Sequence, residues 1–206
     1  MAKANYFLFL GIPVTSDEKA VEDAFARLAA NLKITNFPGD PETAEKSTRA
    51  MAKIREAYTA LKDADFRLTH AEKVKAEGEP FTPDQLKPFL GHVCVAAGII
   101  SYQDLMDAVS KQTDIDLPLG QILQDRGLLS QTELDGMLMG QKLYGAPNRP
   151  IELIVKRLLA LGMVNMDMVK IALIDQRTSM DSLDELLCKR GWLSKNLVDA
   201  FHKSAV

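Results

Sequence analysis

The chain has 206 residues, of which 47% are hydrophobic, 26% charged and 6% aromatic, and this composition excludes a mostly disordered polymer. The formal net charge is −3 and neither half of the sequence is basic, so nucleic acid is not an expected partner. No apolar run approaches the ~20 residues that cross a bilayer, and no membrane insertion is expected. With only two cysteines, a reduced cytoplasmic chain is the expectation.

The first predicted elements are helices. Residues 1–10 hold one Lys and a short apolar stretch, but Gly11, Pro13 and acidic residues follow them, which favours a buried segment over a signal peptide. A Thr-x-x-Glu pattern at residues 15–18 predicts a helix start. Apolar residues then recur at spacings of three and four, as in Val21, Ala24 and Leu28. Similar starts follow at residues 82–85 and 130–133, and strand-like alternation is nearly absent. The sequence therefore predicts an all-α fold.

Residues 1–76 resemble a J domain, the module with which DnaJ-type co-chaperones activate Hsp70. The resemblance rests on Asn5–Ile12, on a Phe-Pro-Gly-Asp loop at residues 37–40 and on the run Ile54–Asp63. It implies a helical hairpin whose connecting loop carries the activating tripeptide His-Pro-Asp. Lys33-Ile34-Thr35 stands in that place here. The family's basic docking helix is also acidic in this chain, so the resemblance implies a retained scaffold without the activating part.

A polar segment at residues 75–80 predicts a domain boundary, and residues 145–150 predict a second break. The C-terminal part is repetitive: a pattern of Leu-Gly, six further residues and Gly occurs at residues 90–98 and again at residues 119–127. Weaker copies surround Gly162 and Gly191. In each copy a short helix is predicted to end at a glycine of positive φ before a Ser or Asn caps the next helix.

These repeats resemble the N-terminal regulatory domain of type II secretion and type IV pilus assembly ATPases, whose paired segments bind cyclic di-GMP in some members. The expected organisation is a J-like domain at 1–76, a linker at 77–82, a first repeat-pair module at 83–145 and a second, degenerate module at 146–206. Val155 and Asp184 replace the leading glycines of the second pair, and Phe89 and Pro118 stand where ligand-binding members carry arginine.

Any nucleotide is therefore expected at the first repeat pair. The candidate binding residues are the two leading Leu-Gly pairs and one glutamine per repeat: Leu90, Gly91, Gln112, Leu119, Gly120 and Gln141. The glycines would let a phosphate approach the backbone N–H groups. Substitution of either glycine by Val is expected to remove binding and to leave thermal unfolding nearly unchanged.

Motifs of enzymes and metal sites are missing. The sequence has no phosphate-binding loop of the Gly-x4-Gly-Lys-Ser/Thr type, no Gly-x-Ser-x-Gly elbow and no His-Glu-x-x-His pair. His70, His92 and His202 are scattered, so no metal site is expected. The protein is therefore expected to be no enzyme and to require no cofactor.

Two classes of function stay open. The first is a bacterial adaptor or regulator that acts by protein–protein contact with a secretion or pilus ATPase, tuned by cyclic di-GMP or serving as a structural subunit. The alternative is a J-domain-like co-chaperone that binds an Hsp70-type chaperone or its clients without activating ATP hydrolysis. The missing His-Pro-Asp tripeptide argues against activation of Hsp70, and the well-formed first repeat pair supports the adaptor.

Overall fold

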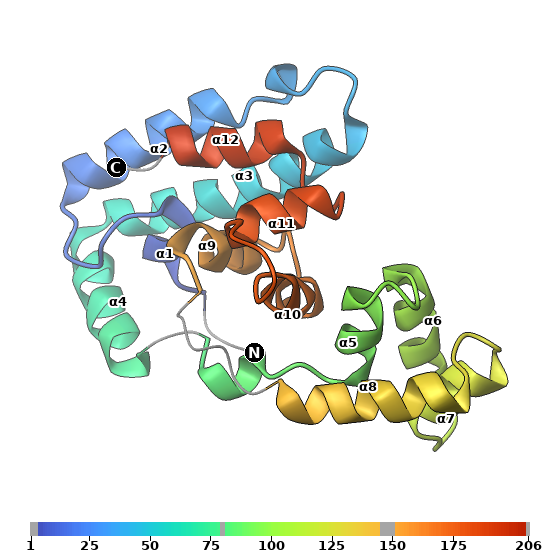
Figure 1. Cartoon of the computed structure of the whole chain (residues 1–206). Coiled ribbons are helices and arrows are strands. Elements are labelled where there is room, and N and C mark those ends of the chain that lie inside the picture. The colour runs from blue at the N-terminus through green and yellow to red at the C-terminus, as the bar shows by residue number, and fades with distance from the viewer. Residues whose placement is uncertain (1–3, 79–80, 145–150, 205–206) are drawn as a thin grey trace. The chain divides into compact units, whose positions relative to one another are not determined.

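A computed structural model describes residues 4–78, 81–144 and 151–204 (Figure 1). These residues form α-helices and two short 3-10 helices, with no strand among them, so the expected all-α class is confirmed. They group into two compact units. Unit 1 comprises Met1–Thr82, Ile151–Asn165 and Ser182–Val206, and unit 2 comprises Pro83–Pro150 and Met166–Asp181. The boundary predicted at residues 75–80 begins within the helix Ala64–Glu77, and its residues 79–80 lie outside the described residues, as does the break predicted at 145–150.

Unit 1 begins with the helices of the J-like region. They are α1 (Tyr6–Leu10), α2 (Glu18–Asn31), the 3-10 helix η1 (Ile34–Asn36), α3 (Pro41–Lys62) and α4 (Ala64–Glu77). Helix α2 packs against α3, with the rings of Phe25 and Tyr58 stacked at 4.1 Å between centroids. The cap of α2 is Asp17, whose carboxylate accepts from the N–H of Ala20. The start predicted at Thr15 is thus two residues early, because Asp17, directly before the first helical residue, makes the cap.

Three C-terminal helices complete unit 1: α9 (Leu153–Leu161), α11 (Leu183–Lys189) and α12 (Lys195–Lys203). Helix α9 packs on α1 and α3, and α12 packs along α2 (Figure 1). Arg157 of α9 is 4% exposed and donates hydrogen bonds to the carbonyls of Phe9 (2.9 Å) and Leu10 (2.8 Å). Lys53 of α3 donates to the last carbonyls of α9. These bonds hold the C-terminal helices against the J-like helices.

This grouping differs from the linear division that the repeats predict. Of the four helices expected in one module at residues 146–206, three lie in unit 1, whereas α10 (Met166–Asp175) lies in unit 2. The physical reason is the buried polar contact of Arg157 with α1, which periodicity along the chain does not encode.

Unit 2 holds the first repeat pair. Its elements are η2 (Pro83–Leu86), α5 (Leu90–Ala96), α6 (Tyr102–Gln112), α7 (Leu119–Asp125), α8 (Gln131–Leu143) and α10. Ser101 and Ser130 cap α6 and α8 in capping boxes, and the repeat glycines have positive φ, both as predicted. The start predicted at Thr82 yields only the 3-10 turn η2, because Pro88 follows it and disfavours helical backbone at the residue before it. The repeats are therefore helical hairpins, which place their two leading Leu-Gly pairs in one unit.

Candidate functional site

The loop between α2 and α3 carries the residues that occupy the tripeptide position. Lys33, Ile34 and Thr35 are exposed, and the side chain of Ile34 is 57% exposed. Residues on either side are held firmly. Asn36 donates from its amide to the carbonyls of Ala30 (3.0 Å) and Asn31 (2.9 Å), the end of α2, and the neighbouring Phe37 is buried. The loop is thus an ordered platform that presents a cation, an apolar side chain and a hydroxyl to solvent.

Ser47 of α3 also anchors the loop between α2 and α3. Its buried hydroxyl donates to the carbonyl of Leu32 at 2.7 Å. This bond satisfies a carbonyl that the end of α2 leaves without a helical partner. The loop is held through the backbone and through side chains outside the tripeptide, so residues 33–35 are open to substitution without loss of the anchor.

The exposed face of α2 has little positive charge. Glu18, Glu22 and Asp23 are exposed there beside Lys19, and Glu22 pairs with Lys62 of α3 at 3.4 Å. Arg27 is half-buried, and its Nε has no hydrogen-bond partner among the described residues. Burial and the neighbouring Arg27 together lower the pKa of Arg157 to about 10. The acidic face expected from the sequence is therefore the face that α2 presents.

Unit 2 contains a cavity of about 880 Å³, which lies within the usual size range of ligand sites. All six residues predicted as a nucleotide site line it. Leu105, Met106 and Val109 of α6 and Leu134 and Leu138 of α8 form apolar walls. The structure thus brings the candidate residues together, while their role in binding a nucleotide stays a prediction.

The two leading glycines are packing positions. A Cβ at Gly91 would lie 2.3 Å from Leu105 Cδ1 and 3.2 Å from Leu119 Cδ2. A Cβ at Gly120 would lie 2.8 Å from Leu134 Cδ1 and 3.5 Å from Leu90 Cδ2. Both glycines are buried, so leucine side chains occupy the space that the sequence analysis left open for a phosphate. The glycines let each short helix approach its partner closely.

The polar lining of the cavity carries acceptors and acids. Asp125 and Asp167 line it, together with Gln112, Gln121, Gln124 and Gln141, and its described lining includes no Lys or Arg. Phe89 and Pro118 also line it, at the positions where the resemblance places arginine. Gln112 donates its amide N–H to the carbonyl of Leu117 at 3.1 Å. The cavity is therefore poorly matched in charge to an anionic ligand.

His92 and Asp167 form a polar contact that sequence reasoning missed. The N–H of Phe89 donates to Nδ1 of His92 at 2.8 Å, so Nδ1 is the acceptor and Nε2 carries the proton of the neutral ring. Nε2 lies 3.0 Å from Oδ1 of Asp167. The hydrogen bond from His92 holds the pKa of Asp167 below its usual range. These residues lie 75 positions apart, and no local pattern links them.

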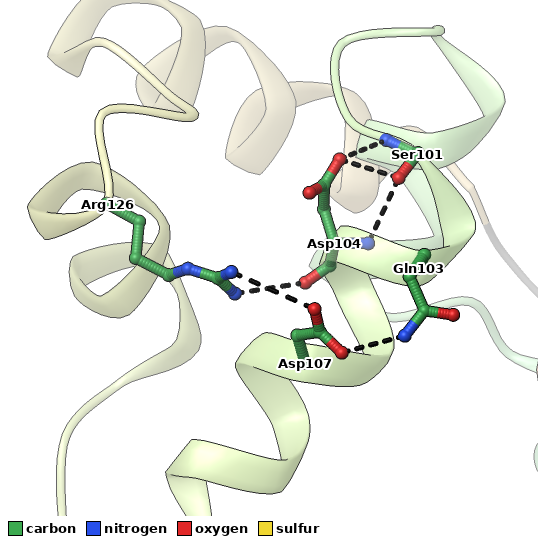
Figure 2. Close-up of polar contacts among 5 residues, drawn as sticks. All are labelled: Ser101, Gln103, Asp104, Asp107 and Arg126. Atoms are coloured by element: carbon green, nitrogen blue, oxygen red, sulfur yellow. Dashed lines mark hydrogen bonds and ion pairs between the residues drawn. The ribbon is translucent and has the colours of Figure 1, made fainter.

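A polar cluster on the surface of unit 2 fastens the two repeats to each other (Figure 2). Arg126, which follows α7, reaches the carbonyl of Asp104 at 3.5 Å and the carboxylate of Asp107 at 3.9 Å, both on α6. Gln103 donates to Asp107 at 2.8 Å. Because Ser101 and Asp104 also close the capping box of α6, the cluster fixes the α6 wall of the cavity relative to α7.

Other reactive side chains do not gather into a site. Among residues 4–78, 81–144 and 151–204, no group of three or more His, Cys, Asp or Glu is placed to hold a metal ion. Burial raises the pKa of the Cys94 thiol to about 11. Burial also raises the pKa of the Cys188 thiol, and both shifts disfavour the reactive thiolate. Within the same described ranges, no helix is long and apolar enough to cross a membrane.

Comparison with known proteins supports the J-like region. No protein-family model matches the chain, and no solved structure does. The chain is 40% identical over 70 residues to the chaperone protein DnaJ of Allorhizobium ampelinum, 37% identical to that of Agrobacterium fabrum and 37% identical to that of Rhizobium rhizogenes. Each match covers 34% of this chain and 17–18% of the relative.

The matched part is thus less than a fifth of the length of these chaperones. Its extent, 70 residues, is close to that of the J-like domain expected at residues 1–76. The similarity to secretion and pilus ATPases that the repeats suggested finds no support in the same comparisons. The chain therefore contains a J-like domain that is similar to part of DnaJ.

Proposed function

We propose that this chain is a J-domain-like co-chaperone that binds an Hsp70-type chaperone or its client proteins without stimulating ATP hydrolysis. One observation carries the proposal. The ordered loop between α2 and α3, where J domains carry His-Pro-Asp, exposes Lys33-Ile34-Thr35 in this chain. The similarity to three DnaJ chaperones supports the Hsp70-type partner.

The charge of the hairpin supports the absence of activation. The resemblance implies a basic docking helix and an acidic residue in the loop, whereas α2 exposes Glu18, Glu22 and Asp23 and the loop exposes Lys33. Reversed charges slow association and weaken orientation at an interface. The C-terminal helix α12 also packs along α2, where Asn31 donates to Ser204 at 3.0 Å.

A single-turnover ATPase assay with the Hsp70-type chaperone of the host organism tests the proposal. The wild-type chain should leave hydrolysis within about twofold of the basal rate, a barrier change of roughly 0.4 kcal/mol. A tenfold stimulation would overturn the proposal. Binding to the chaperone and to an unfolded client protein is measured in parallel by fluorescence anisotropy. If the chain binds neither of them, the proposal is overturned as well.

A loop variant sharpens the assay. Lys33 has φ −65° and ψ 137°, the extended conformation that a residue before proline prefers, and Ile34 begins a 3-10 helix. The triple substitution Lys33→His, Ile34→Pro, Thr35→Asp is therefore compatible with the present backbone. It should raise stimulation severalfold, whereas the control Lys33→Gln should not. Equal inactivity of the triple variant would show that the tripeptide is not what separates this chain from activating J domains.

A second candidate is an adaptor that a cyclic dinucleotide regulates and that contacts a secretion or pilus ATPase. It rests on one observation, the convergence of all six predicted residues on one cavity. Without lining cations, the two phosphates of cyclic di-GMP lose charge-assisted bonds worth about 1.5–3 kcal/mol each. We expect a dissociation constant weaker than micromolar, and a calorimetric titration of the full chain with cyclic di-GMP measures it.

A further inference from the structure

The cavity of unit 2, called the trough below, has α6 and α8 among its walls, together with α5 and α7. On α6 it is lined by Leu105, Val109 and Gln112, and on α8 by Leu134, Leu138 and Gln141. Each set follows the i, i+4, i+7 spacing of one helical face, and the two sets are offset by 29 positions. Seven helical residues span about 10 Å. Each of these two walls therefore offers a largely apolar face about two helical turns long.

The mouth of this trough is apolar and accessible. Three of its lining residues keep large apolar side chains in solvent: Phe89 is 61% exposed, Leu138 40% and Val109 39%. Exposed apolar side chains gathered around a cavity are typical of interaction sites. Met106 adds a flexible side chain that adapts to different partners.

The charge of the site selects a cationic occupant. Asp125 is exposed at the end of α7. Asp167 is bound to His92 and interacts with Lys170, whose Nζ lies 4.4 Å from the centre of the Phe89 ring at the cavity, so Asp125 is the acid that the lining offers to a ligand. Unit 2 as a whole carries eleven acidic and seven basic side chains. The field around the trough therefore favours a ligand with Lys or Arg beside its apolar groups.

The polar lining also breaks the symmetry of the repeats. Gln121, Gln124 and Asp125 line the cavity from the second repeat. The first repeat has His92, Val95 and Ala96 at the equivalent positions, 29 residues earlier. A ligand with two identical halves would meet different chemistry on the two sides. The asymmetry suits a chain with a direction, such as a helix.

We propose that the trough of unit 2 binds a basic amphipathic helix of a partner protein, two to three turns long. Its apolar stripe packs between α6 and α8, as in other helix-in-groove complexes, and a cation of the ligand lies near Asp125. The inference is independent of the proposed function, since it concerns unit 2 and not the loop of the J-like unit.

The test uses the full chain and three labelled peptides of about 14 residues, roughly four helical turns. One peptide has Leu at i, i+3, i+4 and i+7 with flanking Lys, one has Glu in place of Lys, and one is a scramble of the first. Fluorescence anisotropy should give a dissociation constant near 10 μM or tighter for the Lys peptide. The Glu peptide and the scramble should bind at least tenfold more weakly. Equal binding of all three would overturn the proposal.

Paired variants locate the site. Leu138→Glu should weaken the Lys peptide at least tenfold, and Asp125→Lys at least fivefold. The matched controls are Leu68→Glu and Glu72→Lys on α4, both at exposed positions of unit 1, and both should leave affinity within twofold. Retention of binding by Leu138→Glu would overturn the proposal, as would cyclic di-GMP that binds in this cavity more tightly than the peptide. Circular dichroism checks that each variant is folded.

Discussion

The two repeat pairs share a spacing but differ at their leading glycine positions. In the first pair, Gly91 and Gly120 let α5 and α7 approach their partner helices closely, and a cavity lies between the hairpins. In the second pair, Val155 and Asp184 fill the corresponding positions with buried side chains. The helices that carry them, α9 and α11, pack within unit 1. One repeat pattern thus builds a ligand-sized hollow in one place and a docking face in the other.

Buried polar groups mark the second pair. Arg157 donates to two carbonyls of α1, and Asp184 pairs with His202 of α12 at 2.7 Å. Charged groups of this kind are tolerated inside a protein only where partners satisfy them. The comparison teaches that glycine at the leading position accompanies open space between the hairpins, whereas a larger residue there, together with a buried polar group such as Arg157, accompanies packing into a neighbouring core.

Deletion of the J-like helices is expected to have the largest effect on the second repeat pair. A fragment of residues 82–206 lacks α1, α2 and α3, the elements on which α9 and α12 pack. We expect circular dichroism to show reduced helicity and a non-cooperative melt, in contrast to the independent folding that the linear division predicts. Residues 1–78 added as a separate chain should restore part of the signal. A fully helical fragment with one sharp transition would show that the second pair carries its own core.

Removal of the buried guanidinium is the next largest effect. Arg157→Met leaves the carbonyls of Phe9 and Leu10 buried and unpaired, so we expect a loss of about 3–4 kcal/mol in the free energy of unfolding. Urea denaturation measures it. The control Arg49→Met removes an exposed arginine that lies 3.6 Å from Glu45 and should cost less than about 1 kcal/mol. Similar losses for both variants would contradict the role assigned to Arg157.

A smaller effect is expected in the first pair. Gly91→Ala places a methyl group 2.3 Å from Leu105 Cδ1, and Leu105 is itself buried, so overpacking should cost about 1–3 kcal/mol. Gly136→Ala is the control, because nothing lies within 4 Å of its Cβ position. It should stabilise α8 by roughly 0.5–1 kcal/mol. Both are measured as shifts in thermal unfolding, and an unchanged melt for Gly91→Ala would favour the open approach that the sequence analysis expected.

The smallest expected effect is on pH dependence. Burial raises the pKa of Asp184, but hydrogen bonds from Ser182 and His202 outweigh burial and hold the pKa below its usual range. A carboxyl with a lowered pKa in the folded state stabilises the fold above its unfolded pKa of about 3.9, and this stabilisation is lost as the pH falls further. Wild-type stability should therefore fall more steeply below about pH 4 than that of Asp184→Asn. Parallel pH profiles of the urea midpoint would argue against this pairing.

Local chemistry explains which parts of the fold are predictable from the sequence. The capping boxes at Ser101 and Ser130, the repeat offset of 29 residues and the positive φ of Gly98 and Gly127 all depend on neighbours within one hairpin. The six cavity residues could be found for the same reason, since equivalent positions of two paired hairpins face each other. The sequence analysis missed Asp125 because the equivalent position of the first repeat is Ala96, so the repeated pattern does not mark this position as part of the lining.

Long-range contacts explain what the sequence does not reveal. Arg157 and Phe9 lie 148 positions apart, and a periodic apolar helix such as α9 indicates burial without indicating its partner. The contact of Asp167 with His92 has the same character, since α10 follows the second pair's pattern but lies in unit 2. The J-like hairpin itself is predictable, whereas the anchoring of its loop by Asn36 and Ser47 depends on backbone positions that only the fold supplies.

The bond between Arg157 and the end of α1 has a consequence for synthesis of the chain. Ribosomes make about 5–20 residues per second, so the carbonyls of Phe9 and Leu10 wait on the order of ten seconds for a partner that lies 148 positions later. During that interval the nascent N-terminal helices lack the cover of α9 and α12. The core of unit 1 is therefore finished only after α9 and α12 have been synthesised, and the J-like helices lack their cover until then.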